Sequence, residues 1–307
     1  MPFVRTQAML KRMLSEPIFE WLYRVTTAGY YAKQRVADWW YYTKPIKDEE
    51  NLIMRYMIKD VLPYTMVGRK GLLATYSIIV SAEANAVDGC LVECGVARGG
   101  TATLMLTTSM IKRPVISKPF CRTAWLFDSF EGLPEPTAED GVLRKPQGKD
   151  RSSWDLAKGY CLGTQEEVED LLFNGFGFSR DKVHLVKGWF QDTLPEYRDK
   201  VGDIAVLRID GDWYESTKCC LENLYEQVVD GGYVILDDYA LVGCRKAVDE
   251  FFGLRGRGIP EVVLDGRGGG WFRKGTVYLR CEDVDEDAST GDTDCGNDYC
   301  LPEAGKG

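Results

Sequence analysis

The chain has 307 residues, of which 45% are hydrophobic and 28% charged, so it can bury a sizeable core in one large domain or two modest ones. Its formal net charge of −9 argues against a nucleic-acid binder, because such proteins need a basic surface. The ten cysteines are dispersed, without a Cys-x-x-Cys pair or an apolar leader, which disfavours a secreted disulfide scaffold and predicts a cytoplasmic protein with reduced thiols.

Residues 1–62 are predicted to form a helical, aromatic-rich extension that contains Trp21, Trp39 and Trp40. The stretch is also slightly basic, and a basic aromatic segment can lie on a membrane surface. We favour packing on the neighbouring domain or on a second subunit, or a lid over an active site. No apolar run approaches the length needed to cross a bilayer, so we expect no membrane insertion.

Residues 63–281 are predicted to form an α/β domain. Runs rich in Val, Ile and Leu have the character of strands buried on both faces, and they cover 90–96, 123–130, 183–190, 204–212 and 231–239. The stretch 214–229 has helical spacing of apolar residues. Strands that alternate with helices predict a doubly wound, mostly parallel sheet. Segments 261–266 and 275–281, around a Gly-rich loop, predict a C-terminal antiparallel hairpin.

Residues 282–307 carry nine acidic residues and one lysine. This composition predicts a disordered, solvated tail. The rest of the chain is then nearly neutral.

Polar residues at the strand ends are the candidates for ligand binding, because ligands of an open α/β sheet bind beyond the carboxyl ends of its strands. The first strand ends in the turn Glu93–Ala97, whose glycine permits a tight bend before a helix. A dinucleotide also suits such a turn, but the Gly-x-Gly-x-x-Gly spacing is missing, and the Glu93 carboxylate suits the cationic S-adenosylmethionine better. Asp128, after the second strand, can accept hydrogen bonds from ribose hydroxyls of either cofactor or cap a helix.

Four carboxylates follow two other strands, Asp210 and Asp212 after one and Asp237 and Asp238 after the next. Residues two apart in an extended segment point the same way, so Asp210 and Asp212 are expected to face one crevice. Adjacent parallel strands bring the other pair beside them. Such carboxylates repel one another unless a cation neutralises them, and hard oxygen ligands favour Mg²⁺. Helix capping or simple solvation is the alternative for each Asp.

The only histidine, His184, lies inside a predicted strand and is interpreted as structural. This disfavours a Ser-His-Asp or Cys-His mechanism and a His-rich zinc site. Asp212 is the best-placed general base, but a carboxylate with a pKa of about 4 is a weak base toward an alcohol. A metal that binds the hydroxyl lowers its pKa and removes this mismatch. The pattern therefore predicts methyl transfer from S-adenosylmethionine to a metal-activated hydroxyl of a small molecule.

Several motifs together resemble the macrocin O-methyltransferase family, namely VECGVARGGT, LFDSFEGLP, GWFQDTLP, LRIDGDWYEST, GGYVILDDY and GCRKAVDEFF. The similarity extends from about Tyr64 to Lys274, and the end of this range, Gly270–Lys274, resembles the family's closing hairpin. It implies a Rossmann-like class I methyltransferase domain and Mg²⁺-dependent methylation of sugar hydroxyls in macrolide and aminocoumarin biosynthesis. It also implies a homo-oligomer with subunit contacts through the N-terminal region.

Matching the motifs residue by residue assigns the roles that the resemblance implies. The metal ligands would be Asp210, Asp237 and Asp238, and the catalytic base would be Asp212. S-adenosylmethionine would be held by Thr65, Met66, Glu93, Cys94, Gly95, Val96, Ala97, Asp128, Ser129, Phe130, Glu131 and Gly132.

Three alternatives stay open at this point. A catechol-type Mg²⁺ O-methyltransferase shares the metal chemistry but acts on planar phenols. An NAD(P)-dependent oxidoreductase shares the fold but needs a pyrophosphate-binding turn and a proton donor that the sequence lacks in the expected places. A non-catalytic S-adenosylmethionine-binding scaffold has no use for a repulsive cluster of four aspartates.

Overall fold

The computed structural model describes residues 48–113, 122–141, 159, 161–254 and 258–275. They belong to one compact unit, which ends at Gly275. Most of the predicted N-terminal extension, the acidic tail and segment 276–281 of the predicted hairpin lie outside the described residues.

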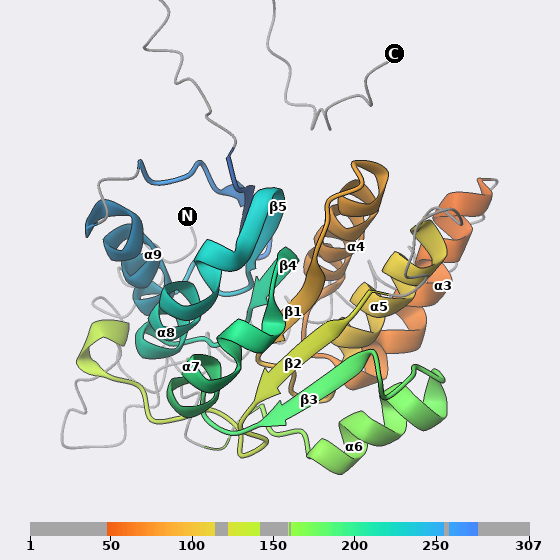
Figure 1. The fold of residues 1–307 in the computed structure, drawn as a ribbon, viewed down its shortest axis with the longest axis horizontal. Coiled ribbons are helices and arrows are strands. Elements are labelled where there is room, and N and C mark those ends of the chain that lie inside the picture. Colours follow the sequence, from red (N-terminus) through yellow and green to blue (C-terminus); the bar gives the residue numbers. More distant parts are fainter. Residues whose placement is uncertain (1–47, 114–121, 142–158, 160, 255–257, 276–307) are drawn as a thin grey trace, which may run out of the picture. The chain divides into compact units, whose positions relative to one another are not determined.

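The described chain forms a seven-stranded sheet between layers of helices (Figure 1). The strand order is β3-β2-β1-β4-β5-β7-β6, with parallel pairing from β3 to β5 and antiparallel pairing of β7 with β5 and β6. The strands are β1 Cys90–Cys94, β2 Ala124–Asp128, β3 Val183–Lys187, β4 Ile204–Ile209, β5 Val228–Leu236, β6 Val263–Leu264 and β7 Gly270–Arg273. The predicted doubly wound, mostly parallel α/β fold with a C-terminal antiparallel hairpin is confirmed.

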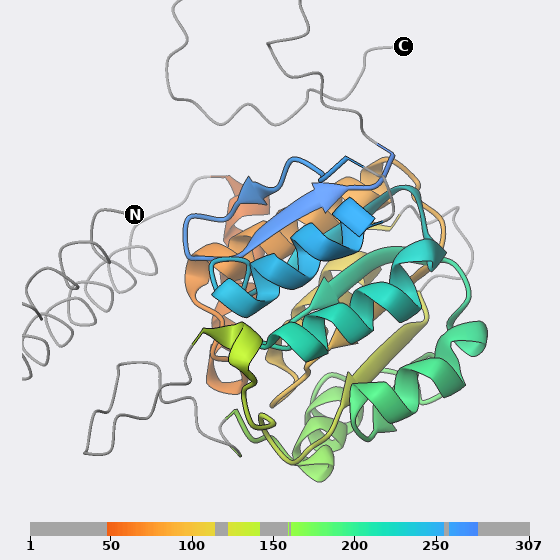
Figure 2. The same ribbon diagram turned by 90° about the vertical axis from the view of Figure 1, so that its left-hand side faces the viewer.

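Two helical layers cover the two faces of the sheet. One layer contains α4 (Arg69–Ala84), α5 (Gly100–Lys112) and α6 (Gln165–Glu169), which continues as a π-helical turn, η3 (Asp170–Gly175). The helix α3 (Glu49–Val61) packs against α4 and α5. The other contains α7 (Phe190–Val201), α8 (Tyr214–Leu224) and α9 (Val242–Leu254), the layer that faces the viewer in Figure 2. Three 3₁₀ turns complete the described elements: η1 (Leu62–Tyr64), η2 (Ala138–Asp140) and η4 (Tyr225–Gln227).

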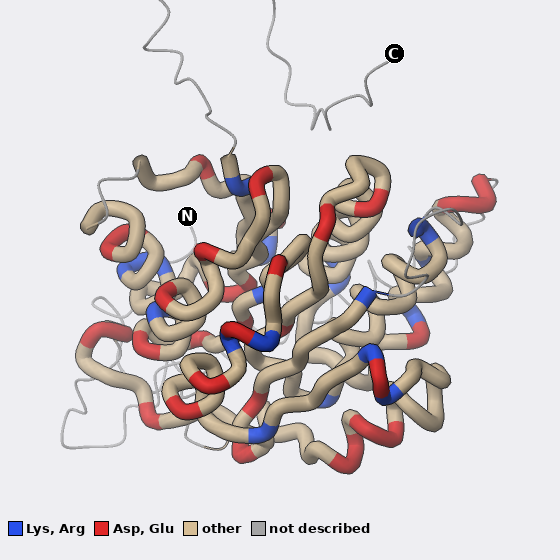
Figure 3. The backbone as a smooth tube through the Cα atoms, in the orientation of Figure 1, with Lys and Arg blue, Asp and Glu red and all other residues tan. Residues whose placement is uncertain are grey.

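Successive strand residues are buried on opposite faces of the sheet. In β4, Val206 packs with the α4 and α5 side, whereas Leu207 packs with the α7, α8 and α9 side, and both are fully buried. This explains the near-continuous apolar runs in the sequence. Acidic and basic residues are interspersed along the described backbone (Figure 3). Within the described part of the chain, every helix is too short or too polar to span a membrane.

Several predicted limits differ from the observed ones. The predicted helix 214–229 ends as α8 at Leu224, because η4 follows and Val228 already pairs with Ile204 of β4. The partner of β6 is β7, within the segment predicted as a Gly-rich loop, because the backbone of Gly270–Arg273 pairs on both sides. This is the segment that resembled the family's closing hairpin.

The register of the central strands positions the site. Cys94 of β1 is level with Phe127 of β2 and Ile209 of β4, and Ile209 is level with Leu236 of β5. The residues that follow these positions therefore emerge at one edge of the sheet.

Candidate functional site

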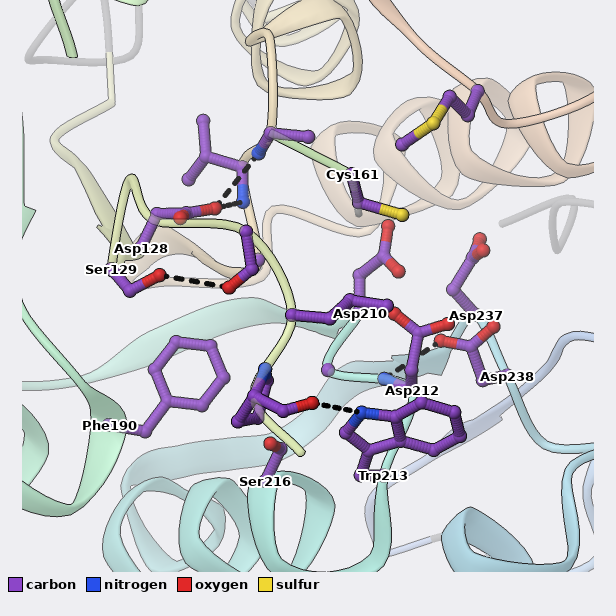
Figure 4. Close-up of a pocket in the computed structure, with 18 of the residues that line it drawn as sticks. Asp128, Ser129, Cys161, Phe190, Asp210, Asp212, Trp213, Ser216, Asp237 and Asp238 are labelled. Carbon is purple, nitrogen blue, oxygen red and sulfur yellow. Dashed lines mark hydrogen bonds between the residues drawn. The ribbon is translucent and has the colours of Figure 1, made fainter. Parts of the chain in front are cut away.

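A cavity of about 840 Å³ opens at the carboxyl ends of β1, β2, β4 and β5 (Figure 4). Many of the predicted site residues line it, and these are Thr65, Met66, Gly95, Val96, Ala97, Asp128, Ser129, Gly132, Asp210, Asp212, Asp237 and Asp238. Glu93, Cys94, Phe130 and Glu131 are not among the lining residues.

The turn after β1 passes very close to the turn after β4. Gly95 has a φ of 93°, and a Cβ on it would lie 1.8 Å from the carbonyl oxygen of Asp210. The amide of Asp210 also donates to the carbonyl of Cys94 at 2.8 Å. Only glycine allows this approach, so the first residue after β1 also sets the position of the first acidic residue after β4.

Asp128 holds the same turn from the side of β2. Its Oδ2 accepts hydrogen bonds from the amides of Val96 at 2.7 Å and Ala97 at 2.9 Å (Figure 4). Its Oδ1 accepts one from the amide of Phe130 at 2.7 Å. Burial raises the pKa of Asp128, although these backbone hydrogen bonds act against the increase. Among the described residues, Oδ2 thus accepts two hydrogen bonds and Oδ1 only one, so Oδ1 keeps a lone pair for one further donor in the cavity.

Glu93 is placed differently from the prediction that it faces a cationic cofactor. Its side chain is fully buried inside the sheet, level with Arg208 of β4, and its Oε1 accepts a hydrogen bond from Arg208 Nη1 at 3.0 Å. Burial raises the pKa of Glu93 to about 8, despite the opposing attraction of Arg208. The local motif could not predict this pairing, because Arg208 belongs to the neighbouring strand and lies directly opposite Glu93.

The positions of the other predicted residues that do not line the cavity can also be explained. Cys94 and Phe130 are buried in the cores on either side of the sheet. Glu131 is exposed, and its amide donates to the Ser129 hydroxyl at 3.0 Å. At the opposite wall, the Thr65 hydroxyl lies 3.2 Å from that of Thr101 and accepts a hydrogen bond from the amide of Val67.

Three aspartates converge after β4 and β5. Asp210, Asp237 and Asp238 each offer a carboxylate oxygen, and these oxygens all lie within 4.8 Å of one another. An all-oxygen set of this size suits a hard divalent cation such as Mg²⁺, which takes few protein ligands and keeps several waters. The residues that the sequence predicted as ligands are thus the ones that the fold brings together.

Arg208 donates hydrogen bonds to two of these aspartates. Its Nη1 donates to Asp210 Oδ2 at 2.7 Å and its Nη2 donates to Asp237 Oδ1 at 2.6 Å. Burial raises the pKa of Asp210 and of Asp238, and the neighbouring carboxylates add to both increases. For Asp237, Arg208 and Arg267 outweigh burial and lower the pKa. Two arginines therefore face five acidic groups, Glu93 included, and the excess negative charge favours a bound cation.

Asp212 reaches the cavity by a different route from the one predicted. β4 ends at Ile209, and Asp212 has a left-handed backbone with a φ of 54° in a tight turn, where the amide of Trp213 donates to the carbonyl of Gly211 at 2.5 Å. The expected extended alternation is wrong here, although Asp210 and Asp212 both line the cavity. Burial raises the pKa of Asp212 to about 7, with further increases from Asp210 and Asp237.

A segment that follows β2 closes one wall of the cavity. The Trp213 indole donates to the carbonyl of Pro134 at 3.1 Å (Figure 4). Asp140 is buried, and its Oδ1 accepts a hydrogen bond from the amide of Tyr214, the first residue of α8, at 2.7 Å. The same carboxylate accepts from the amide of Thr137. These bonds connect the wall to the turn that carries Asp212.

Sequence reasoning missed several lining residues. Phe190 and Gln191 follow β3 closely, so the rule of strand ends could have identified them. Cys161 and Arg267 come from loops without a sequence signal. His184 lies in β3, 4.4 Å from the ring of Trp125 between centroids, and is not part of the cavity wall.

Comparison with known proteins gives a consistent picture. The model of a protein family described as macrocin O-methyltransferase (TylF) matches residues 42–274. The 8-demethyl-8-(2,3-dimethoxy-alpha-L-rhamnosyl)-tetracenomycin-C 4'-O-methyltransferase of Streptomyces olivaceus is 37% identical over 208 residues, which cover 68% of this chain and 75% of that protein. The mycinamicin III 3''-O-methyltransferase of Micromonospora griseorubida is 32% identical, with coverage of 68% and 78%. The structure of the O-methyltransferase NovP superposes with a TM-score of 0.60 at 30% identity, covering 74% of this chain and 99% of NovP.

Proposed function

The chain belongs to the macrocin O-methyltransferase family, and from this premise we propose that it transfers the methyl group of S-adenosylmethionine to a sugar hydroxyl of a glycoside with the help of a divalent cation. The reaction class follows from the family, which decides against the oxidoreductase and the non-catalytic scaffold. A sugar acceptor is favoured over a catechol because the name of one relative, the tetracenomycin enzyme, specifies a rhamnosyl-bearing acceptor.

The observation that carries the proposal is the convergence of Asp210, Asp237 and Asp238 in a cavity that the turn after β1 also lines. The cofactor would lie against the Gly95–Ala97 turn and Asp128, and the acceptor beside the three aspartates. A bound Mg²⁺ would supply the Lewis acidity that lowers the pKa of an acceptor hydroxyl.

The residues of the chain would then perform three tasks. Asp212 accepts the hydroxyl proton as the acceptor oxygen forms a bond to the methyl carbon and the bond from this carbon to sulfur breaks, which leaves S-adenosylhomocysteine. Asp128 and the turn that it holds keep the cofactor in place. Trp213 and the Pro134 segment close the wall and limit water, and exclusion of water favours a step in which opposite charges disappear.

An acceptor screen tests the proposal. The protein is incubated with S-adenosylmethionine carrying a tritiated methyl group and with panels of glycosides and phenols, with and without EDTA. We expect label on glycosides only, and loss of transfer with EDTA that excess Mg²⁺ restores. Transfer that EDTA leaves unchanged would contradict the metal, and transfer to phenols alone would contradict the sugar acceptor.

Two variants distinguish a specific loss of metal binding from a general loss of structure. Asp237→Asn should raise the Mg²⁺ concentration needed for half-maximal activity, because the amide is a weaker ligand than the carboxylate. Asp230→Asn, at an exposed position of β5, is the matched control and should leave the Mg²⁺ requirement unchanged.

We also propose that the protein is a homo-oligomer and that it is cytoplasmic, as the resemblance and the sequence predict. Analytical ultracentrifugation of the full chain tests the first, since a monomer at micromolar concentration would contradict it. Cell fractionation tests the second.

A further inference from the structure

Both carboxylate oxygens of Asp237 are engaged by arginines. Oδ1 accepts a hydrogen bond from Arg208 Nη2 at 2.6 Å, and Oδ2 accepts one from Arg267 Nη2. The face that Asp237 would turn to a cation is thus already in contact with a positive charge.

A short, ordered loop between β6 and β7 carries Arg267. Oδ1 of Asp265 accepts hydrogen bonds from the amides of Arg267, Gly268 and Gly269 at 2.7, 3.0 and 3.1 Å. The carbonyl of Gly268 accepts one from the amide of Ala240 at 2.7 Å, just after β5. The loop is therefore tied to the strand end that carries Asp237.

The side chain of Arg267 crosses two glycines at the start of α4. A Cβ on Gly68 would lie 3.2 Å from Arg267 Cδ, and a Cβ on Gly71 would lie 3.1 Å from its Nε. The stem of Arg267 thus lies close against the α4 backbone with its guanidinium at the cavity, where it is a lining residue.

The two arginines differ in how easily they can leave Asp237. The Arg208 side chain is 0% exposed and also binds Glu93 and Asp210, so its departure would leave buried carboxylates uncompensated. The Arg267 side chain is 31% exposed and faces the cavity, where water or a ligand can solvate it. Of these two contacts, only that of Arg267 can be exchanged at low cost.

We propose that Arg267 is the resident counter-ion of Asp237 and that a divalent cation displaces it on binding. The inference rests on the proposed metal site and adds to it a competing residue of the chain itself. Both oxygens of Asp237 accept hydrogen bonds from arginines, so a dication bound to this carboxylate repels a guanidinium beside it and favours its withdrawal. Arg267 thereby offsets the charge of Asp237 while the cation is absent and weakens the apparent affinity for the cation.

Metal binding measures this exchange without any reaction. Titration calorimetry with Mn²⁺ compares the full-length wild-type protein with Arg267→Ala, Arg267→Lys and Arg245→Ala. We expect Arg267→Ala to bind Mn²⁺ about tenfold more tightly, a difference of about 1.4 kcal/mol in binding free energy, because the cation then has no Arg267 guanidinium to displace. Arg267→Lys should stay close to wild type because it retains a positive charge.

The control residue, Arg245, lies on α9 with its guanidinium 5.0 Å from the ring centroid of Tyr239 and is not a cavity residue. Arg245→Ala should leave the Mn²⁺ affinity unchanged. Unchanged or weaker Mn²⁺ binding by Arg267→Ala would overturn the exchange, as would a crystal structure with Mn²⁺ in which Arg267 still contacts Asp237.

The same titration, extended to Asp237→Asn, distinguishes this failure from failure of the proposed function. If Asp237→Asn weakens Mn²⁺ binding while Arg267→Ala has no effect, the metal site stands and only the exchange is wrong. If neither the wild-type protein nor Arg267→Ala binds Mn²⁺, the metal site and the exchange are both overturned.

Discussion

Asp212 combines an acidic side chain with a backbone conformation that non-glycine residues rarely adopt. Its φ is 54°, and its amide donates to Asp238 Oδ2 at 3.2 Å. A residue in the left-handed region costs about 1–3 kcal/mol, and it persists only where the surroundings determine it. Here the Trp213 and Tyr214 hydrogen bonds to the opposite wall supply that constraint. The carboxylate is thus held in the cavity before any ligand arrives.

Replacing Asp212 tests its role as base. Asp212→Asn keeps the size of the side chain and removes proton acceptance, so we expect turnover to fall by about 10²–10⁴-fold. Binding of S-adenosylhomocysteine and Mn²⁺, measured by calorimetry, should change little. A variant with near wild-type turnover would remove Asp212 from the mechanism.

At the scale of secondary-structure elements, one buried ion pair connects the ends of α4 and α5 with the start of β2. Glu83 accepts hydrogen bonds from Arg122 Nε at 2.6 Å, Ser109 Oγ at 2.5 Å and Arg113 Nη1 at 3.0 Å. Arg122 also donates to the carbonyls of Val87 and Gly89. The pair thus anchors the loop that leads into β1.

This pair predicts a pH-dependent stability. Burial acts to raise the pKa of Glu83, but the hydrogen bonds from Arg122 and Ser109 outweigh it, and the net pKa lies below the usual 4.5. A lowered pKa in the folded state stabilises the fold above the unfolded pKa, and this stabilisation is lost as the pH falls through the folded value.

Urea unfolding of Glu83→Gln between about pH 7 and pH 3 measures this effect. At neutral pH the variant should lose about 3–5 kcal/mol of unfolding free energy, because a buried arginine loses its partner. The difference from wild type should shrink as the pH falls. Glu196→Gln, in an exposed pair on α7, should cost at most about 1 kcal/mol at any pH. A pH-independent difference for Glu83→Gln would contradict the assignment.

A second prediction concerns the contact between α9 and Asp140, in the segment that follows β2. A Cβ on Gly243 would lie 1.9 Å from Asp140 Oδ1 and 3.0 Å from the amide of Tyr214. Gly243→Ala should therefore separate Asp140 from the start of α8 and raise the KM for the acceptor more than that for S-adenosylmethionine.

Gly253→Ala, on the same helix, is the matched control, because an added Cβ there meets nothing within 4 Å. It should leave both KM values unchanged and stabilise the protein by about 0.4–1 kcal/mol. Equal behaviour of the two alanine variants in steady-state kinetics would show that Asp140 does not position the wall.

At the scale of the whole molecule, the site is assembled from positions far apart in the chain. Cavity residues range from Tyr64 to Arg267, and they meet only when β1, β2, β4 and β5 are in register. Ligands that bind this arrangement bind the folded state alone, so they must stabilise the entire described unit.

Thermal unfolding should report this coupling. S-adenosylhomocysteine at about 100 times its Kd adds about 2.7 kcal/mol, which corresponds to an increase in Tm of about 5–11 °C for a domain of this size. Mn²⁺ should add a separate increase. In Asp237→Asn the increase with Mn²⁺ should be smaller and that with S-adenosylhomocysteine should remain. Loss of both would indicate that the variant disrupts the fold.

The sequence by itself determined the fold class and the acidic strand ends. Buried strands are readable because both faces of a parallel sheet are covered, and the side at which ligands bind follows from parallel topology alone. For this reason Asp210, Asp237 and Asp238 could be predicted to lie together. Motif resemblance supplied the family, Thr65 and Met66, and the residues that follow Asp128.

Only the tertiary structure decided how the charges pair and how the turns bend. Glu93 faces Arg208 rather than a cofactor because the register of β1 against β4 places them opposite each other, 115 positions apart in the chain. Asp212 enters the cavity through a left-handed turn rather than an extended strand, and Arg267 reaches Asp237 from the loop of the β6–β7 hairpin. Local sequence determines periodicity, whereas ion pairing depends on which side chains share a low-dielectric space after the chain has folded.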